Sequence, residues 1–428
     1  MSEDRSTRLG PSTARAARPR RSDVTVVLAV CALTLVAGYL FKAQCLSPWI
    51  DNHQYEVLCY NDIQPLYGIR GIQDGTFPYV HAQLVGGDLV DGGIEYPVLT
   101  GVFMWFAGLF VNDANAYLKI SALLLAPFGL LAGYFLARLA GRRALLWAAA
   151  PAIVLYAFHN WDLLVVAAMV AGFWAWHRDK PAWAAVAFAL GGALKLFPIF
   201  FLAPLALDRW FRRDRKGAIV TSAVGVGTWL AVNLPFAVIN FDGWFGTYEF
   251  HEQRLPNFDS MWFQGWPDMT VQSLNRLTTL LLVGSFLAIL AVSLVRARST
   301  GVYPFLQVCG ALLAAFLLWN KVHSPQYTLW LMPFFVVLAT SVVWWLAYTA
   351  VDLMVYVGVF RWFFNGAESA RHAMQYGVWA RAGLLLLLIG VFMFSKTALT
   401  GEEPVTAGDR EPLLPGGPVR AADATATV

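Results

Sequence analysis

The chain has 428 residues, of which 58% are hydrophobic and only 14% are charged. Because an ordinary globular domain carries roughly 25% charged residues, this chain has too little polar surface to cover a water-soluble body. Aromatic residues make up 15% of the chain, an abundance typical of proteins that anchor at two membrane interfaces. The composition predicts a multi-span membrane protein. It excludes a soluble enzyme, a nucleic-acid binder with a basic face and a single-pass receptor with a large ectodomain.

The N-terminal region predicts on which side of the membrane the chain starts. Several Arg residues stand among Ser, Pro and Ala before the apolar run from Val24 to Phe41. Basic residues ahead of a first span hold the N-terminus in the cytoplasm. We therefore expect a disordered cytoplasmic segment over residues 1–23, followed by an uncleaved anchor rather than a signal peptide. Residues 399–428, rich in Pro, Gly, Ala and Thr, are expected to form a disordered cytoplasmic tail.

Apolar runs between these ends are the candidates for membrane spans. Several are shorter than the roughly 20 residues that a full crossing needs, so short or broken helices are expected. The run over 182–207 is either one long helix or two half-helices broken at Gly191-Gly192, with Pro198 as a second weak point. We expect an all-α polytopic membrane protein over residues 24–398, with about twelve transmembrane helices. The runs cover residues 24–41, 97–111, 116–137, 144–158, 163–176, 182–207, 217–238, 271–294, 302–319, 327–346, 347–360 and 382–394.

Basic loops leave two topologies open. A strict positive-inside reading places all of them in the cytoplasm, which requires that run 97–111 does not cross and that run 182–207 forms a hairpin. Twelve simple crossings instead place the two earlier basic loops outside. The loops lie around Arg138, Arg142 and Arg143, at residues 177–180, at residues 208–216, and at Arg296 and Arg298.

In both topologies the segments 42–96, 239–270 and 320–326 share the external face. The first two are long, and loops of such length are more often functional than merely connecting. Carboxylates, histidines and Trp residues in these segments suggest a site that handles a polar substrate beside lipid. Cys45 and Cys59, both in the first segment, are equally compatible with one disulfide and with two free thiols.

Two polar clusters in the first external segment are candidates for chemistry. Asp62 follows Asn61 and precedes Arg70, and it is either a functional carboxylate or a turn-forming residue on a wet loop. Glu95-Tyr96-Pro97 stands where the chain re-enters the membrane. Glu ahead of Pro also makes a good helix start, which needs no function.

Two further clusters place lysines at or within apolar runs. Residues 320–327 bring Lys321, His323, Gln326 and Tyr327 to a membrane boundary, which is costly unless these side chains pair or face a cavity. Lys195 lies inside an apolar run, where it either extends to the interface or faces a phosphate. The stretch Phe158–Asp162, between two short runs, is a similar but weaker candidate.

Several motifs of other enzyme classes are missing from the chain. It contains no Walker loop, no Asp-x-Asp pattern for a metal-bound nucleotide sugar and no Cys/His spacing of a zinc site. The sequence therefore argues against nucleotide and nucleotide-sugar substrates and predicts no cofactor and no metal. Lipid-linked sugar donors remain compatible with it.

Taken together, Tyr60-Asn61-Asp62-Ile63, Glu95-Tyr96-Pro97, Lys195-x-x-Pro198 and the 321–327 motif resemble the GT-C glycosyltransferases. Within that superfamily the chain resembles glycosyltransferase family 87, which includes actinobacterial polyprenyl-phosphate-mannose-dependent α-mannosyltransferases. The resemblance covers about residues 24–400. It implies a GT-C fold in a bacterial plasma membrane, with an active site on the external face. It also implies transfer from a polyprenyl-phosphate sugar to a glycolipid or lipoglycan of the cell envelope.

The resemblance also implies roles for individual residues. The family's loop aspartate maps onto Asp62 and its late-loop histidine onto His323. A phosphate ester is a good leaving group, so the enzyme needs a base for the acceptor hydroxyl and cations for the departing phosphate. We expect Asp62 to be the base and His323 to hold the phosphate, although a histidine is also a suitable base. The other expected phosphate ligands are Lys321, Arg70 and Lys195.

Substrate contacts are expected from Glu95, Tyr96, Gln326 and Tyr327. Trp262 and Trp266 in the second long loop either stack on sugar faces or anchor at the membrane interface. With a β-linked donor, a single displacement gives an α product. The predicted function is therefore an inverting hexosyltransferase that uses polyprenyl-phosphate mannose.

Other functions remain open at this stage. Transfer of arabinofuranose or of another lipid-linked sugar stays within the same enzyme class. A flippase or transporter of lipid-linked sugars is the main rival from another class, and a non-catalytic scaffold is a further one. Transport by alternating access favours ionisable residues within spans, whereas here the polar groups collect on one face and run 217–238 contains no charge.

Overall fold

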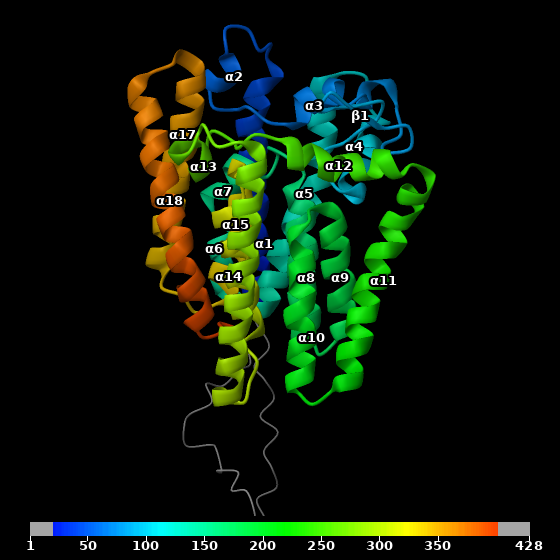
Figure 1. Ribbon diagram of the computed structural model, residues 1–428. Coiled ribbons are helices and arrows are strands. Elements are labelled where there is room, and N and C mark those ends of the chain that lie inside the picture. The colour runs from blue at the N-terminus through cyan, green and yellow to red at the C-terminus, as the bar shows by residue number, and fades with distance from the viewer. Residues whose placement is uncertain (1–19, 401–428) are drawn as a thin grey trace, which may run out of the picture.

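The computed structural model describes residues 20–400, and nearly all of its regular structure is helical (Figure 1). Among these residues, six helices are long and apolar enough to cross a membrane, which confirms an all-α, multi-span membrane protein. The expected disordered ends lie largely outside the described residues, and the first helix already begins at Arg21. The six helices are α1 (Arg21–Ala43), α5 (Ala114–Ala140), α11 (Arg215–Ile239), α14 (Val271–Thr300), α17 (Val342–Asn365) and α18 (Glu368–Phe394).

Shorter helices fill the space between the long ones. α16 and most of α8 and α15 are buried, and each is apolar around its whole circumference, as expected of interior helices. α8 packs along α5 and α9, and α15 packs along α18. The shorter helices are α4 (Val98–Gly108), α6 (Leu145–Ala148), α7 (Pro151–Tyr156), α8 (Asp162–His177), α9 (Pro181–Leu194), α10 (Leu202–Phe211), α15 (Phe305–Trp319) and α16 (Thr328–Val337).

Basic loops gather at one end of the helix bundle, at the bottom of Figure 1. Arg142, after α5, forms an ion pair of 2.8 Å with Asp23 at the start of α1. Arg209 of α10 forms one of 2.7 Å with Asp179 after α8. Arg296 of α14 donates a hydrogen bond to a carbonyl at the end of α18. We call this the lower end and the opposite one the upper end.

α4 begins and finishes at the upper end and therefore does not traverse the bundle. Trp105 in its last turns donates a hydrogen bond of 3.1 Å to the carbonyl of Gly75, in the first loop segment. Asn115, at the start of the next helix, reaches the carbonyl of Leu46 in the same segment. The run 97–111 is thus not one of the traversing segments, as the positive-inside topology requires.

Residues 181–211 form a hairpin, which is the second requirement of that topology. Of the two alternatives for this run, one long helix is wrong and two half-helices are present. The break falls at the extended residue Lys195, between the expected weak points at Gly191-Gly192 and Pro198. The 3₁₀ turn η4 (Phe197–Phe201) then leads into the returning α10. A Cβ atom on Gly191 would lie 2.9 Å from the Cβ of Pro198, so the glycine pair allows the two legs to pack closely.

One predicted boundary near the C-terminal side is wrong. The runs 327–346 and 347–360 divide at residues 338–341, because α16 ends at Val337 and α17 begins at Val342. The Ser341 side chain accepts a hydrogen bond from the backbone N–H of Val343, which is typical of a helix N-cap.

Segments 42–96, 239–270 and 320–326 all lie at the upper end, as the sequence predicted (Figure 1). The first contains a two-stranded antiparallel hairpin that turns at Gly86-Gly87, where both residues have positive φ. Asn240, at the start of α12, donates hydrogen bonds to the carbonyls of Val80 and Ala82 and so attaches the second segment to the first. The elements of these segments are η1 (Gln44–Leu46), α2 (His53–Glu56), α3 (Ile63–Ile69), η2 (Ile72–Asp74), β1 (Gln83–Val85), β2 (Asp88–Val90), α12 (Phe241–Gln253), α13 (Met261–Gly265) and η5 (Pro325–Tyr327).

Candidate active site

Two neighbouring cavities open at the upper end. The first, of about 410 Å³, contains Asp62 and is called the Asp62 cavity. The second, of about 440 Å³, contains Lys321 and is called the Lys321 cavity; it is the more apolar of the two. The residues shared by both linings are Glu95, Tyr96, Lys195, His251 and Tyr327.

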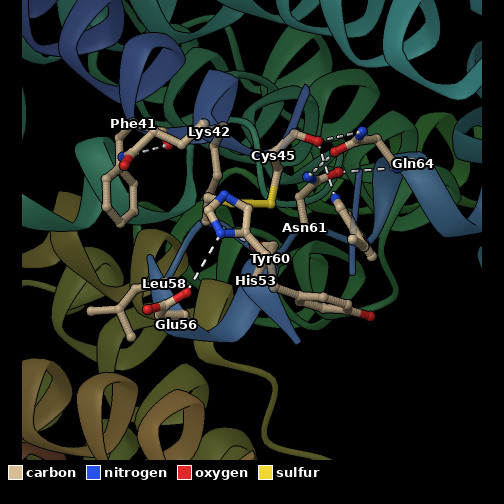
Figure 2. The surroundings of a disulfide bond; sticks show 12 residues. Phe41, Lys42, Cys45, His53, Glu56, Leu58, Tyr60, Asn61 and Gln64 are labelled. Carbon is tan, nitrogen blue, oxygen red and sulfur yellow. Dashed lines mark hydrogen bonds and ion pairs between the residues drawn. A yellow bond between two sulfur atoms is a disulfide. The ribbon is translucent and has the colours of Figure 1, made fainter. Parts of the chain in front are cut away.

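A disulfide anchors the chain just ahead of Asp62. Cys45 and Cys59 are joined in a bond, which resolves the alternative that the sequence left open (Figure 2). The side-chain carbonyl of Asn61 accepts a hydrogen bond of 3.0 Å from the backbone N–H of Gln64, and this contact fixes the first turn of α3. Gln64 in turn donates to the carbonyl of Cys45 at 3.0 Å. Asp62 therefore stands on a short helix tied back to the end of α1.

The Asp62 carboxylate is approached by nitrogen atoms at its Oδ2. Asn160 Nδ2 donates a hydrogen bond of 2.8 Å, Gln326 Nε2 lies at 3.5 Å and His159 Nε2 at 3.8 Å. The side chain remains 24% exposed, toward the cavity that it lines. Burial raises the pKa of Asp62, and the hydrogen bond from Asn160 partly offsets that rise. A carboxylate with a raised pKa is a stronger base at neutral pH than an ordinary aspartate.

Lys195 places a cation where the two cavities meet. Its Nζ lies 3.6 Å from Asp162 Oδ1, 3.2 Å from Asn160 Oδ1 and 4.1 Å above the ring of Tyr96. The extended backbone at the turn of the 181–211 hairpin carries this side chain to the upper end. Lys195 therefore faces both cavities, and its contact with a phosphate stays a prediction.

Asn160 connects the carboxylate with the cation. It is fully buried, donates to both Asp62 and the hydroxyl of Tyr96, and accepts from Lys195. The sequence marked the stretch 158–162 only as a weak candidate, because a polar residue between two short helices has no specific pattern.

Arg70 lies outside both cavities, contrary to the expectation that it holds a phosphate. Its Nε forms an ion pair of 2.6 Å with Glu95 Oε2, and its guanidinium also donates to the carbonyl of Leu89. Glu95 lines both cavities, and its contact with a substrate stays a prediction. Arg70 therefore acts on the site through Glu95, whose carboxylate it holds in place.

His323 is also directed away from the Asp62 cavity. Only 4% of the residue is exposed, and its Nδ1 donates a hydrogen bond of 3.0 Å to the carbonyl of Leu317. The ring borders a separate void of about 10 Å³ beside Asp259 and Arg381. Burial lowers the pKa of His323 well below its usual range. In this arrangement the expected contact of His323 with a phosphate is absent.

The rest of the 321–327 motif does reach the cavities. Lys321 lines the Lys321 cavity and donates hydrogen bonds to the carbonyl of Glu252 and to Asn275 Oδ1, at 2.8 and 2.6 Å. Burial lowers the pKa of Lys321 to about 8. Gln326 lines the Asp62 cavity, and Tyr327, stacked on Trp330 with 3.8 Å between ring centroids, lines both.

The two tryptophans proposed for sugar stacking do not line either cavity. Trp262 is buried, and its indole N–H donates to the carbonyl of Trp319. Trp266 is 47% exposed and packs between Trp262 and Trp379. The structure therefore favours packing of these two rings over stacking on a sugar in either cavity.

α12 and the residues after it supply contacts that the sequence did not single out. His251 lines both cavities, and its Nε2 donates to the carbonyl of Glu95 at 2.7 Å. Burial lowers the pKa of His251 to about 4, which keeps it neutral. Arg254 lines the Asp62 cavity, and within residues 20–400 its guanidinium has no ion-pair partner. His251 lies in the last turn of α12 and Arg254 directly follows that helix, and no motif in the sequence marks either residue.

Comparison with known proteins agrees with this geometry. The family model of glycosyltransferase family 87 matches residues 95–321, which is more than half of the chain. The match begins at Glu95, includes Lys195 and ends at Lys321. A search of curated proteins finds no match. Family membership supports a membrane glycosyltransferase over the transporter and scaffold alternatives. The chain belongs to glycosyltransferase family 87.

Proposed function

We propose that the protein transfers mannose from a polyprenyl-phosphate donor to a hydroxyl of a cell-envelope glycolipid or lipoglycan. The observation that carries this proposal is the position of Lys195, whose ammonium stands between the Asp62 cavity and the more apolar Lys321 cavity. This arrangement suits a donor that joins a sugar, a phosphate and a lipid chain. The base lies on the side of the sugar, the cation beside the phosphate and the apolar cavity on the side of the lipid chain.

The Lys321 cavity is suited to the donor lipid. Its lining includes Phe197, Phe316 and Trp330, with Lys195 and Lys321 as the cationic members. Apolar walls with a few placed polar groups are what an amphiphilic ligand needs. The donor phosphate then lies near the two lysines, and the prenyl chain extends along the aromatic side chains toward the membrane.

The reaction follows from this placement. The acceptor hydroxyl enters the Asp62 cavity, and Asp62 takes its proton as the oxygen attacks the anomeric carbon of mannose. The bond between that carbon and the phosphate oxygen breaks, and the departing electron pair stays on the phosphate. Lys195 stabilises the charge that develops there, with Arg254 as a second cation. Attack opposite to the leaving group inverts a β-linked donor to an α product.

The upper end is proposed to face the outside of the plasma membrane. Basic loops collect at the lower end, which is the arrangement of cytoplasmic loops. The disulfide between Cys45 and Cys59 lies at the upper end, and disulfides persist in oxidising compartments. In this orientation the chain passes through the membrane twelve times, because the 181–211 hairpin contributes two passes and α4 contributes none.

The test is transfer of labelled mannose from polyprenyl-phosphate mannose to acceptors in membranes that contain equal amounts of each variant. Asp62→Asn is expected to lower transfer by roughly 10²–10⁴-fold, the usual contribution of a general base. Asp51→Asn is the matched control: it lies in the same segment, is exposed and has a positive φ that Asn tolerates.

Each other outcome of this assay has a defined meaning. Transfer only from polyprenyl-phosphate arabinose would replace mannose as the donor sugar within the same mechanism. Full activity of Asp62→Asn would contradict the assignment of the base. If the wild-type protein moved the donor lipid between leaflets but transferred no sugar, the proposal that it is a glycosyltransferase would be contradicted.

A further inference from the structure

Lys42, in the last turn of α1, is a buried lysine with three close neighbours. Its Nζ lies 2.7 Å from the carbonyl oxygen of Tyr60, 3.3 Å from the hydroxyl of Tyr356 and 3.3 Å from His159 Nδ1. The residue has no exposed surface, and within the described chain it forms no ion pair. Figure 2 shows Lys42 and Tyr60 beside the disulfide. Since burying an amine is costly, the hydrogen bonds of Lys42 determine its protonation state.

The protons around Lys42 can be assigned from its partners. The carbonyl of Tyr60 can only accept. The hydroxyl of Tyr356 donates its own proton to the carbonyl of Leu58, at 2.5 Å, and so accepts from Lys42. An ammonium has three N–H groups and no lone pair, so a charged Lys42 can hydrogen-bond to His159 Nδ1, at 3.3 Å, only if Nδ1 accepts. The proton of the neutral imidazole must then be on Nε2.

The second ring nitrogen of His159 faces the proposed base. His159 Nε2 lies 3.8 Å from Asp62 Oδ2, and the backbone N–H of Asp62 donates to the carbonyl of His159 at 2.8 Å. Burial and the neighbouring Lys42 both lower the pKa of His159 well below its usual range, so the ring is neutral. In the Nε2–H form it presents a donor to the carboxylate. In the other tautomer it would present a lone pair.

We propose that Lys42 is a positioning residue that holds His159 in its Nε2–H tautomer and so keeps a donor, not a lone pair, directed at Asp62. The statement about the tautomer is independent of the reaction. The statement about catalysis rests on the proposed function, because it takes Asp62 as the base. Lys42 touches no substrate, since it lines neither cavity.

The tautomer is measured by ¹⁵N NMR of protein with labelled histidine in lipid nanodiscs. The chain has seven His residues, and the signal of His159 is assigned by its loss in His159→Gln. In the wild-type protein we expect protonated Nε2 and unprotonated Nδ1. Lys42→Met should convert this signal to a mixture of tautomers. Lys119→Met, which removes an exposed lysine from α5, should leave it unchanged.

The same variants are then compared in mannose transfer. Lys42→Met removes the contact between the charged Lys42 and His159, and it should lower kcat roughly tenfold to a hundredfold with little change in the KM for the donor. Lys42→Gln keeps an N–H that can donate to His159 and should recover part of both the signal and kcat. A merely structural role would instead lower the amount of active enzyme without changing the tautomer.

A wild-type spectrum with the proton on Nδ1 would overturn the proposal, and this result needs no variant to fold. An unchanged tautomer in folded Lys42→Met would also overturn it. If the wild-type protein transfers no sugar, the proposed function fails, but the spectrum still decides the role of Lys42. If the wild-type protein transfers sugar and Lys42→Met matches it in kcat, the catalytic part of the proposal fails alone.

Discussion

The amide of Asn160 donates a hydrogen bond of 2.8 Å to the carboxylate of Asp62, although the two residues are 98 positions apart in the chain. The carbonyl oxygen of the same amide accepts from Lys195 at 3.2 Å. A neutral group therefore stands between the proposed base and the proposed phosphate ligand. A direct ion pair with Lys195 would lower the basicity of Asp62, and Lys195 instead pairs with Asp162 at 3.6 Å.

Removal of this amide should weaken the site more than the fold. Asn160→Ala is expected to lower kcat roughly tenfold to a hundredfold, because Asp62 loses its shortest side-chain hydrogen bond. Asn160→Asp should lower kcat further than Asn160→Ala, since a second carboxylate would then face Asp62. Steady-state transfer at matched protein levels measures both. Wild-type kcat in Asn160→Ala would show that the amide does not support the base.

Lys195 and Asp162 should behave as a coupled pair. Lys195→Met removes the cation for the phosphate but also leaves Asp162 buried without its ion-pair partner. We expect a loss of thermal stability of about 3 kcal/mol together with loss of transfer. Adding Asp162→Asn should restore the stability but not the transfer. If the double variant regains activity, Lys195 serves the fold and not the phosphate.

Arg70 and Glu95 should be coupled in the same way, through an ion pair of 2.6 Å. Arg70→Gln and Glu95→Gln should each raise the KM for substrate. The KM of the double variant should not exceed the higher of the two single-variant values. A thermodynamic cycle from the three variants checks this. Fully additive effects would indicate that Arg70 contacts the substrate independently of Glu95.

The pH profile of transfer should be limited by two groups. Asp62 must be ionised to act as a base, so activity falls as pH decreases through its pKa, which burial raises above the ordinary aspartate value of about 3.9. Lys321 must be protonated to attract a phosphate, so the KM for the donor rises above pH 8, where its pKa lies. Lys321→Arg should remove the alkaline limb. An unchanged alkaline limb in that variant would assign it to another group.

The disulfide between Cys45 and Cys59 should stabilise the segment that carries Asp62. Cys45→Ala is expected to cost about 2–4 kcal/mol of stability and to lower transfer, because Gln64 and Asn61 lose their anchored neighbour. Reduction of the wild-type protein should have the same effect. Reductant should not lower the stability of the double variant Cys45→Ala/Cys59→Ala any further. Cys309→Ala, which removes a free buried thiol, is the control for the loss of a cysteine outside the disulfide. Equal stability of the reduced and oxidised wild-type protein would contradict this role.

Composition and local motifs were sufficient for the membrane class and the family, and they predicted some of the residues that line the two cavities, among them Asp62, Lys195 and Lys321. Apolar runs report burial in lipid directly, and a charged residue in such a run is costly enough to indicate a cavity, as at Lys195. The family resemblance agrees with the family match, which includes Glu95, Lys195 and Lys321 but begins after Asp62. Each of these inferences depends only on the residues of one short segment and on the environment that those residues require.

Only the tertiary structure decided which side chains meet. The sequence placed Asp62, Arg70 and His323 together as one site, but a residue's direction depends on neighbours far along the chain. Arg70 forms an ion pair with Glu95, and the ring of His323 borders the void beside Asp259. Asn160 and Lys42 gain their roles from contacts 98 and 117 residues away. The sequence thus determined the kinds of groups present at the upper end. Packing of the helices decided their partners, because hydrogen bonds and ion pairs in a buried site form between whichever groups the fold brings within about 3 Å.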